Sequence, residues 1–349
     1  MRYAKLETGA RFNLASSGVQ DCTLEELGAR WDDLALHGPN PYGYGPLVER
    51  IAERYAAPAQ CVVAPGGGCS FANHLAMAAL LEPGEEVLIE DPTYELLLAA
   101  LGALSAQTRT FERRAEDGFR LDPEAVARAV TPATRLIVVT HLHNPSGAGA
   151  GEAEVAEVAR LAHARGAHVL VDEVYRELTF TDGVVRTAFD PDGCVVVTSS
   201  LTKAYGLSGL RCGWVLAPAA LAERMRRLND LFGVVGPHVA ERLAVVAFDR
   251  LAELRARAAG IVGANRDAYR EQLGGHPALD QEIFPHATTV FPRLIDRDAD
   301  AFAARLAAEF DTCVTPGRFF GRPEHLRIGL GGDPASTREG LERLARALS

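Results

Sequence analysis

The sequence has few cysteines, and none of them is spaced as a metal-binding or dithiol pair. No CxxC motif occurs, which argues against a zinc site and against a thioredoxin-like redox site. The six cysteines lie at positions 22, 61, 69, 194, 212 and 313. We therefore expect reduced thiols, no disulfide framework and no metal ligand set.

The sequence also lacks a long apolar run and a long basic run. Its longest apolar run, residues 96–106, is too short to cross a bilayer, and residues 1–7 contain no apolar signal core. The formal net charge is −10, which argues against binding to nucleic acid or to an acidic membrane. We therefore expect a cytoplasmic protein with neither of these partners.

Short apolar strands that alternate with amphipathic helices make up most of the chain. Strands are predicted at residues 61–64, 86–90, 136–140, 168–171, 194–197 and 288–291. Helices are predicted at residues 47–55, 71–81, 95–104, 123–130, 152–165, 218–228, 238–257, 261–273 and 300–310. The alternation predicts an α/β fold with a parallel sheet and right-handed crossovers, followed after residue 216 by a smaller α+β region.

The length of 349 residues exceeds one ordinary core and predicts two units. We expect a large domain over residues 37–239, and a small domain formed by residues 1–36 together with residues 240–349.

Five chemically distinct groups each follow a predicted strand. They are the turn Gly68-Cys69-Ser70, then Tyr94, Asn144, Asp172 and Lys203. Ligands in parallel α/β sheets bind beyond the carboxyl ends of the strands, so these groups are expected to converge at one edge. The glycine turn also leads into a helix, whose free N–H groups favour an anion.

Lys203 follows a buried strand, where poor solvation lowers the pKa of an ammonium group. A free amine attacks carbonyl carbons and forms a Schiff base. Ser200 and Arg211 lie on either side and have the hydrogen-bond donors that a phosphate needs. The alternatives are a solvated loop lysine, or a structural salt bridge between Lys203 and the buried Asp172.

These residues resemble the lysine signature of the class I/II aminotransferases, which are fold-type I pyridoxal-phosphate enzymes. The matching segments are Ser200-Leu201-Thr202-Lys203 with Arg211, Asp172-Glu173-Val174-Tyr175, Asn144-Pro145-Ser146-Gly147, Gly68-Cys69-Ser70, Tyr94, and Arg327 within Leu-Arg-Ile-Gly. The resemblance extends from about residue 42 to residue 327. It implies a three-layer αβα large domain with a mainly parallel sheet, and a smaller α+β domain formed by both termini.

The resemblance also implies roles for single residues toward pyridoxal 5'-phosphate. Lys203 would form the Schiff base, Asp172 would contact the ring nitrogen, and Tyr175 and Asn144 would reach the ring hydroxyl. Tyr94 would stack on the ring, and the phosphate would be held by Gly68, Cys69, Ser70, Ser200 and Arg211. Cys69 occupies a position where the family usually has a small residue such as alanine.

For the substrate, the resemblance implies that Arg327 binds the α-carboxylate, with Asn144 nearby. The segment from Asn13 to Gly18 is expected to line the substrate entrance, with Gly18 as a substrate-binding residue. It further implies a homodimer with shared active sites, in which Tyr42 reaches the phosphate of the partner subunit, with Tyr44 as the alternative. Arg113, Arg186 and Arg318 are candidates for a distal substrate carboxylate.

The expected activity is transfer of an amino group between an L-amino acid and a 2-oxo acid. A pyridoxal-phosphate-dependent lyase or cyclase acting on an amino acid is the alternative, because the cofactor determines the chemistry more than the fold does. A non-catalytic regulator that binds the cofactor is a third possibility.

Overall fold

A mainly parallel sheet lies at the centre of the protein in the computed structural model, which describes residues 2–179 and 186–349. The sheet has seven strands in the order β2-β8-β7-β6-β5-β3-β4. The strands are β2 (Val62–Val63), β3 (Glu86–Asp91), β4 (Gln107–Glu112), β5 (Thr134–Thr140), β6 (His168–Asp172), β7 (Val195–Ser200) and β8 (Gly213–Leu216). Strands β3 to β7 run parallel to one another, and β8 runs antiparallel to both β7 and β2.

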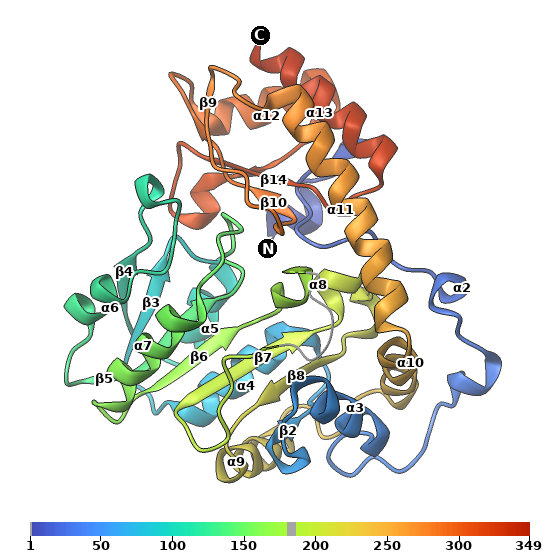
Figure 1. The fold of residues 1–349 in the computed structure, drawn as a ribbon, viewed down its shortest axis with the longest axis vertical. Helices are drawn as coiled ribbons and strands as arrows, with labels where there is room; N and C mark the ends of the chain where they lie inside the picture. Colours follow the sequence, from blue (N-terminus) through green and yellow to red (C-terminus); the bar gives the residue numbers. More distant parts are fainter. Residues whose placement is uncertain (1, 180–185) are drawn as a thin grey trace.

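Helices cover both faces of this sheet, which gives three layers (Figure 1). Successive side chains of a strand point to opposite faces, so Leu136 and Val138 enter one core while Ile137 and Val139 enter the other. The first face packs against α4 (Gly68–Leu80), α5 (Glu95–Ala103) and α9 (Ala219–Asn229). The second face packs against α3 (Gly45–Tyr55), α6 (Pro123–Ala129), α7 (Glu152–His163) and α10 (His238–Asp249).

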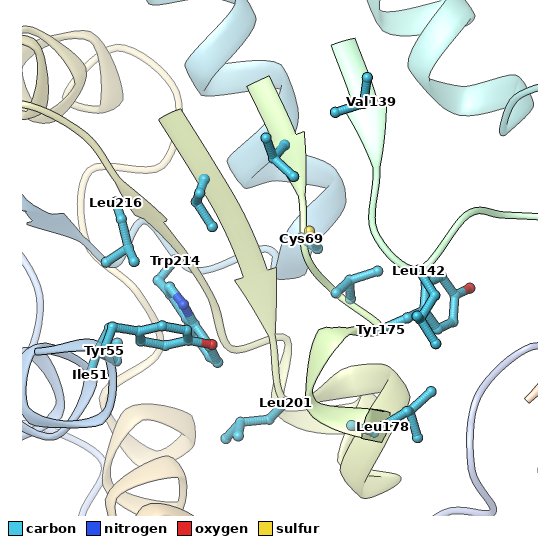
Figure 2. Close-up of a cluster of buried hydrophobic side chains, with 14 of the residues drawn as sticks. Ile51, Tyr55, Cys69, Val139, Leu142, Tyr175, Leu178, Leu201, Trp214 and Leu216 are labelled. Atoms are coloured by element: carbon cyan, nitrogen blue, oxygen red, sulfur yellow. The ribbon is translucent and has the colours of Figure 1, made fainter. Parts of the chain in front are cut away.

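Figure 2 shows part of the core on the second face. Tyr55 of α3 lies beside Trp214 of β8, with their ring centroids 5.9 Å apart. Cys69 and Tyr175 belong to the same cluster of buried side chains. Two residues of the predicted site are therefore fixed by packing in the core as well as by their own hydrogen bonds.

Both ends of the chain contribute to a second core, which lies above the large sheet in Figure 1. Its strands are β1 (Phe12–Asn13), β9 (Leu279–Asp280), β10 (Thr289–Val290), β11 (Arg293–Leu294), β12 (Thr312–Cys313), β13 (Thr315–Pro316) and β14 (Leu326–Gly329). Its helices are α12 (Ala299–Phe310), α13 (Pro334–Leu348) and the end of α11 (Leu251–Leu273). The short helices α1 (Arg2–Leu6) and α2 (Leu24–Leu27) lie near the N-terminus, and α8 (Thr202–Tyr205) follows β7.

Helix α11 connects the two cores. Leu254 and Ala258 pack into the core of the large sheet, whereas Tyr269 and Leu273 pack into the second core. Helix α10 also packs on the large sheet. The division of the chain at residues 36/37 and 239/240 stays a prediction.

The structure differs from the predicted elements in several places. The single helix predicted over residues 238–257 is wrong, because Arg250 leaves the helical conformation (φ −122°, ψ 21°) and separates α10 from α11. The elements not predicted from the sequence are strands β4 and β8, most of the short strands of the second core (β1, β9, β11, β12, β13 and β14), and helices α1, α2, α8 and α13. No helix in the described part of the chain is long and apolar enough to cross a membrane.

Candidate active site

The carboxyl ends of β3, β5, β6 and β7 surround one cavity of about 170 Å³. The cavity is lined by Ser17, Cys69, Ser70, Asn73, Tyr94, Thr140, Asn144, Asp172, Val174, Tyr175, Ser200, Thr202, Lys203 and Arg211. Most of these lining residues belong to the matched motifs, and the structure brings them together from distant parts of the sequence. Gly68 adjoins the cavity through its contact with Arg211.

Lys203 lies in α8, just after β7. Burial is the main cause that lowers the pKa of Lys203 to about 8, the positive charges of Arg327 and Arg211 add to the effect, and Asp172 opposes it. The Lys203 Nζ donates a hydrogen bond to Ser17 Oγ at 3.1 Å. Near neutral pH the ammonium form of Lys203 still predominates, but the free amine, which acts as a nucleophile or a base, is far more populated than in an ordinary lysine.

Asp172 ends strand β6 and is 5% exposed. Its carboxylate accepts hydrogen bonds from Asn73 Nδ2 (2.7 Å), Val174 N (3.0 Å) and Cys69 Sγ (3.3 Å). Burial raises the pKa of Asp172, and these three donors and the charge of Lys203 lower it again. The geometry thus differs from a direct salt bridge, since Lys203 donates to Ser17 while Asp172 takes other donors.

The glycine turn before α4 forms a cradle with Arg211. Gly66, Gly67 and Gly68 all have positive φ (75°, 66° and 73°), which favours glycine at each position. A Cβ at Gly68 would lie 2.5 Å from Arg211 Nη2, and this guanidinium also donates to Gly67 O at 2.9 Å. Ser200, fully buried at the end of β7, lies in the same cavity. The turn, the helix N-terminus and the guanidinium together suit an anion.

Arg327, on β14, faces the site from the second core. Its Nη1 donates to Asn144 Oδ1 at 3.1 Å, and its Nη2 donates to Ala15 O at 2.8 Å and to Thr315 Oγ1 at 3.3 Å. Its guanidinium carbon lies 5.0 Å from the centroid of the Phe320 ring. The Nε of Arg327 is buried without a hydrogen-bond partner among the described residues, so this N–H is still available to a ligand.

A network of buried polar side chains fixes the position of Asn144. The Asn144 N–H donates to Thr140 Oγ1 at 3.2 Å, and Thr140 Oγ1 donates to Glu90 Oε1 at 2.5 Å. Glu90 also forms an ion pair with Arg113 at 2.8 Å, and both side chains are fully buried. Arg113 is thus committed to Glu90, which makes it a poor candidate for a distal substrate carboxylate.

The other two candidate arginines also have carboxylate partners outside the cavity. Arg186 pairs with Glu152 at 3.4 Å, and Arg318 pairs with Asp300. The structure therefore brings neither of them into the site cavity, whose lining does not include them.

The predicted tyrosines and Gly18 occupy different places. The Tyr175 hydroxyl lies 2.8 Å from Ser17 Oγ, and Tyr94 lines the cavity at the start of α5. A Cβ at Gly18 would lie 3.3 Å from Lys203 Cδ, which places Gly18 against the lysine.

Tyr42 and Tyr44 lie away from these residues. Tyr42 accepts a hydrogen bond from Arg227 at 2.6 Å, and its side chain is exposed at the surface. Tyr44 packs edge-on against His238, with ring centroids 5.0 Å apart. Neither tyrosine lines the cavity of its own chain.

A cavity of about 480 Å³ borders Arg30 and Arg242, and two still larger cavities, each of about 570 Å³, lie elsewhere in the molecule. One borders Glu173 and Arg176, and the other borders Phe119 and His325. None of these three is lined by Lys203 or Asp172, so the reactive groups gather in the cavity of about 170 Å³. Among the described residues, no group of His, Cys, Asp or Glu side chains has the geometry of a metal site.

The contacts that two residues make in the site were not predicted from the sequence. Asn73 donates to Asp172, and Ser17 links Lys203 to Tyr175. Asn73 lies four residues after Cys69 on an apolar helix, so its position on the same helix face was a usable signal. Ser17 lies in the segment from Asn13 to Gly18 that was expected at the substrate entrance, but no pattern in the sequence indicated the contacts of its side chain with Lys203 and Tyr175.

Comparisons with known proteins agree with this geometry. The sequence model of the family "Aminotransferase class I and II" matches residues 33–344. An arginine–pyruvate transaminase from Pseudomonas aeruginosa is 32% identical, over 98% of this chain and 91% of the relative. Capreomycidine synthase from Streptomyces vinaceus is 30% identical, over 97% of this chain and 90% of the relative.

A solved structure has nearly the same fold. A PLP-dependent aminotransferase from Streptococcus suis superposes with a TM-score of 0.90 at 25% identity, and the match covers 99% of this chain and 95% of that one. The fold, the family match over most of the chain and the transaminase relatives lead to one conclusion. The chain belongs to the class I and II aminotransferases and is a pyridoxal-phosphate-dependent aminotransferase.

Proposed function

We propose that this enzyme transfers an amino group between an L-amino acid and a 2-oxo acid through Lys203, with Asp172 and Tyr175 as further catalytic residues. The observation that carries this proposal is the convergence of a partly free amine, a buried carboxylate and an anion cradle around one cavity. The composition adds support, because the only lysines of the chain are Lys5 and Lys203.

The residues present fit pyridoxal phosphate. The glycine at position 68 leaves room beside Arg211, where a phosphate would also meet the hydroxyls of Ser70 and Ser200. The Asp172 carboxylate suits a protonated ring nitrogen, and Tyr94 offers a flat ring for stacking. Cys69 would lie beside the ring nitrogen, whereas Tyr175 and Asn144 would hold the ring hydroxyl.

The cofactor, when bound, supplies a carbonyl group and a ring that accepts electrons from the substrate α-carbon. Lys203 carries the proton of that step at Nζ, because its pKa of about 8 lets the amine both accept and return a proton. Asp172 holds a negative charge in the buried cavity, where it would stabilise a proton on the ring nitrogen of the cofactor. Arg327 fixes the substrate carboxylate, with Asn144 and Gly18 lining its approach, and so orients the α-carbon toward Lys203.

A cyclase activity is the second candidate, favoured by the similarity to capreomycidine synthase over 97% of the chain. Both activities need the same amine and carboxylate, so the residues of the site do not separate them. The products separate them, because a transaminase releases a 2-oxo acid from its donor and a cyclase does not.

We further propose a homodimer in the cytoplasm, in which Tyr42 contacts the phosphate bound by the partner. Leu231, Phe232, Val234 and Val235 form an exposed apolar patch, with exposed fractions between 47% and 77%. Buried polar atoms without partners among the described residues lie in the adjoining segments, namely Asn40 Oδ1, Asn229 Oδ1, His238 Nδ1 and Glu241 Oε1. Such a face suits a partner surface.

The test is a screen of L-amino acid donors, arginine included, against pyruvate and other 2-oxo acids with purified holoenzyme. Formation of a new 2-oxo acid is expected, and Lys203→Ala should lower the rate by about 10³-fold. Borohydride treatment should attach the cofactor to the peptide that contains Lys203, while Lys5→Arg serves as the matched control. Attachment at Lys5 instead, or full activity of Lys203→Ala, would refute the proposal.

A further inference from the structure

Ser17 belongs to a segment that is anchored in the second core. Its carbonyl accepts a hydrogen bond from Thr288 Oγ1 at 2.8 Å. Three residues earlier, Leu14 O accepts from Gly329 N at 2.6 Å. The backbone of Ser17 is therefore held by residues next to β10 and β14, whereas its side chain reaches the large sheet.

The side chain of Ser17 joins two groups of the proposed site. Ser17 is 6% exposed, and its Oγ lies 3.1 Å from Lys203 Nζ and 2.8 Å from Tyr175 OH. A hydroxyl has one proton and two lone pairs, so it can accept from an ammonium while it shares a proton with a phenol. Val19 N also donates to Lys203 O at 2.9 Å, which fixes the segment against α8.

Few groups near Lys203 can stabilise its ammonium form by charge or by accepting a hydrogen bond. The charged groups around it are Arg327 and Arg211, which disfavour the ammonium, and Asp172, which favours it. The neighbouring titratable group Cys69 is a neutral thiol, because burial raises its pKa. Within the described part of the chain, the acceptor for its Nζ is Ser17 Oγ. A buried ammonium without an acceptor is costly, so the hydroxyl of Ser17 favours the protonated form of Lys203, which burial disfavours.

We infer that Ser17 is a positioning residue for Lys203: its hydroxyl holds the free side chain of the lysine at the cavity and connects it to Tyr175. The inference rests on the proposed role of Lys203 in the reaction. It adds a residue that lies outside the matched motifs and is anchored in the other core of the molecule.

The experiment compares Ser17→Ala with Ser16→Ala, which removes the same atoms from the exposed neighbour. In the cofactor-free protein, the rate at which acetic anhydride modifies Lys203 is followed against pH by peptide mass spectrometry, with Lys5 as internal reference. Ser17→Ala should shift the Lys203 titration downward by about one pH unit, because the ammonium loses its acceptor. Ser16→Ala should leave the titration unchanged.

The holoenzyme supplies the second readout. The single-turnover rate with an amino donor should fall about tenfold in Ser17→Ala with little change in donor affinity, and Ser17→Thr should restore it. Ser17→Cys, similar in shape but a weaker acceptor, should behave like the alanine variant, and it replaces that variant if the alanine variant does not fold.

Equal Lys203 titrations and equal turnover rates in Ser17→Ala and Ser16→Ala would overturn the inference. An inactive wild-type protein would instead refute the proposed function, and the lysine titration would still report on Ser17. The two failures are therefore distinguishable.

Discussion

The carboxylate of Asp172 depends on its three donors because burial alone would favour its neutral form. Asn73 supplies the shortest of these hydrogen bonds, and its own Oδ1 accepts from Thr198 Oγ1. Asn73 therefore orients Asp172 through two strands, β6 and β7. Cys69 contributes a weaker thiol donor.

Replacing Asn73 by alanine should weaken cofactor binding by about tenfold or more, because a hydrogen bond to a charged group is lost. The pKa of Asp172 should rise, so the loss should be larger at pH 6 than at pH 8. Absorbance titration of the cofactor-free protein with pyridoxal phosphate at both pH values measures this. Cys69→Ala is the comparison and should have a smaller effect, and an equal loss at both pH values would indicate a packing defect instead.

The low pKa of Lys203 predicts a pH-dependent stability. A group with a pKa of about 8 when folded and 10.5 when unfolded binds fewer protons in the folded state between these values, so stability rises with pH across that range. Lys203→Met removes this dependence. The methionine variant should be more stable near pH 7 by about 3 kcal/mol, and the advantage should shrink toward pH 10.5.

Urea unfolding of both cofactor-free proteins at several pH values tests the Lys203 prediction. Groups that do not interact with Lys203 titrate equally in both proteins, so the difference between the two stability curves between pH 8 and pH 10.5 reports on Lys203. A difference that does not change with pH would contradict it.

Site residues that belong to a recognisable motif could be predicted from the sequence, whereas site residues outside any motif could not. Asp172 and Lys203 follow obvious strands and carry reactive groups. Ser17 is a common residue in a segment without clear periodicity, and its contacts join positions 158 and 186 residues apart. Pairings at that sequence distance depend on the packing of the two cores, which local patterns do not encode.

At the scale of elements, the turn before α4 depends on glycine at two positions that face each other. Gly68 has a φ of 73°, and a Cβ at Gly213 would lie 2.4 Å from the carbonyl carbon of Gly68. The start of α4 and the start of β8 are therefore in backbone contact. Side chains at either position would separate the helix N-terminus from Arg211.

Gly68→Ala should lower cofactor affinity by about tenfold or more and destabilise the protein by about 1–2 kcal/mol, the cost of an alanine in the left-handed region. Gly102→Ala is the matched control, because Gly102 lies in α5 and an added methyl group would meet nothing within 4 Å. That change should leave cofactor affinity intact and stabilise the protein by about 0.5–1 kcal/mol. Thermal unfolding measures the change in stability, and cofactor titration measures the change in affinity. Unchanged affinity in Gly68→Ala would exclude a role of the glycine turn and Arg211 in holding the phosphate.

Element types were predicted where apolar runs or periodicity were noted, and strands β4 and β8 lacked such a signal. Helix α13 is different, because the helical spacing of Leu341, Leu344 and Leu348 was present in the sequence but was not used. Strand β4 is an edge strand with mostly exposed residues, of which only Phe111 is buried, so it has no apolar run. Strand β8 has only four residues and begins at a glycine. The break at Arg250 separates two helices whose apolar patterns continue across it, so periodicity alone merged them.

At the scale of the whole molecule, the apolar patch of Leu231, Phe232, Val234 and Val235 is exposed to solvent in a single chain. Leu231→Lys should shift the proposed dimer toward monomer, because a charge enters an apolar interface. Sedimentation velocity measures the change. Leu98→Lys, at an exposed leucine on α5 outside the patch, is the control and should leave the mass unchanged.

The same dimer prediction links assembly to cofactor binding. If Tyr42 reaches the cofactor of the partner, then Leu231→Lys and Tyr42→Phe should both weaken cofactor binding, while Leu98→Lys should not. A monomeric wild-type protein, or a Leu231→Lys variant that keeps its dimer mass, would contradict the prediction.

The overall architecture was largely predictable, because alternating strands and helices leave few ways to arrange a chain of this length. The fold class and the mainly parallel sheet are confirmed. The way α11 passes from one core to the other was not predictable, because its apolar positions serve two different neighbours along one helix.

The stretch from Leu14 to Gly18 gives a practical rule for engineering this enzyme toward new donors. Ala15 O holds Arg327, and two residues later Ser17 holds Lys203. Inserting or deleting a residue there would displace both Arg327, the proposed carboxylate-binding group, and Lys203, the proposed proton carrier. Libraries should therefore keep the length of this stretch fixed and place their diversity elsewhere around the cavity.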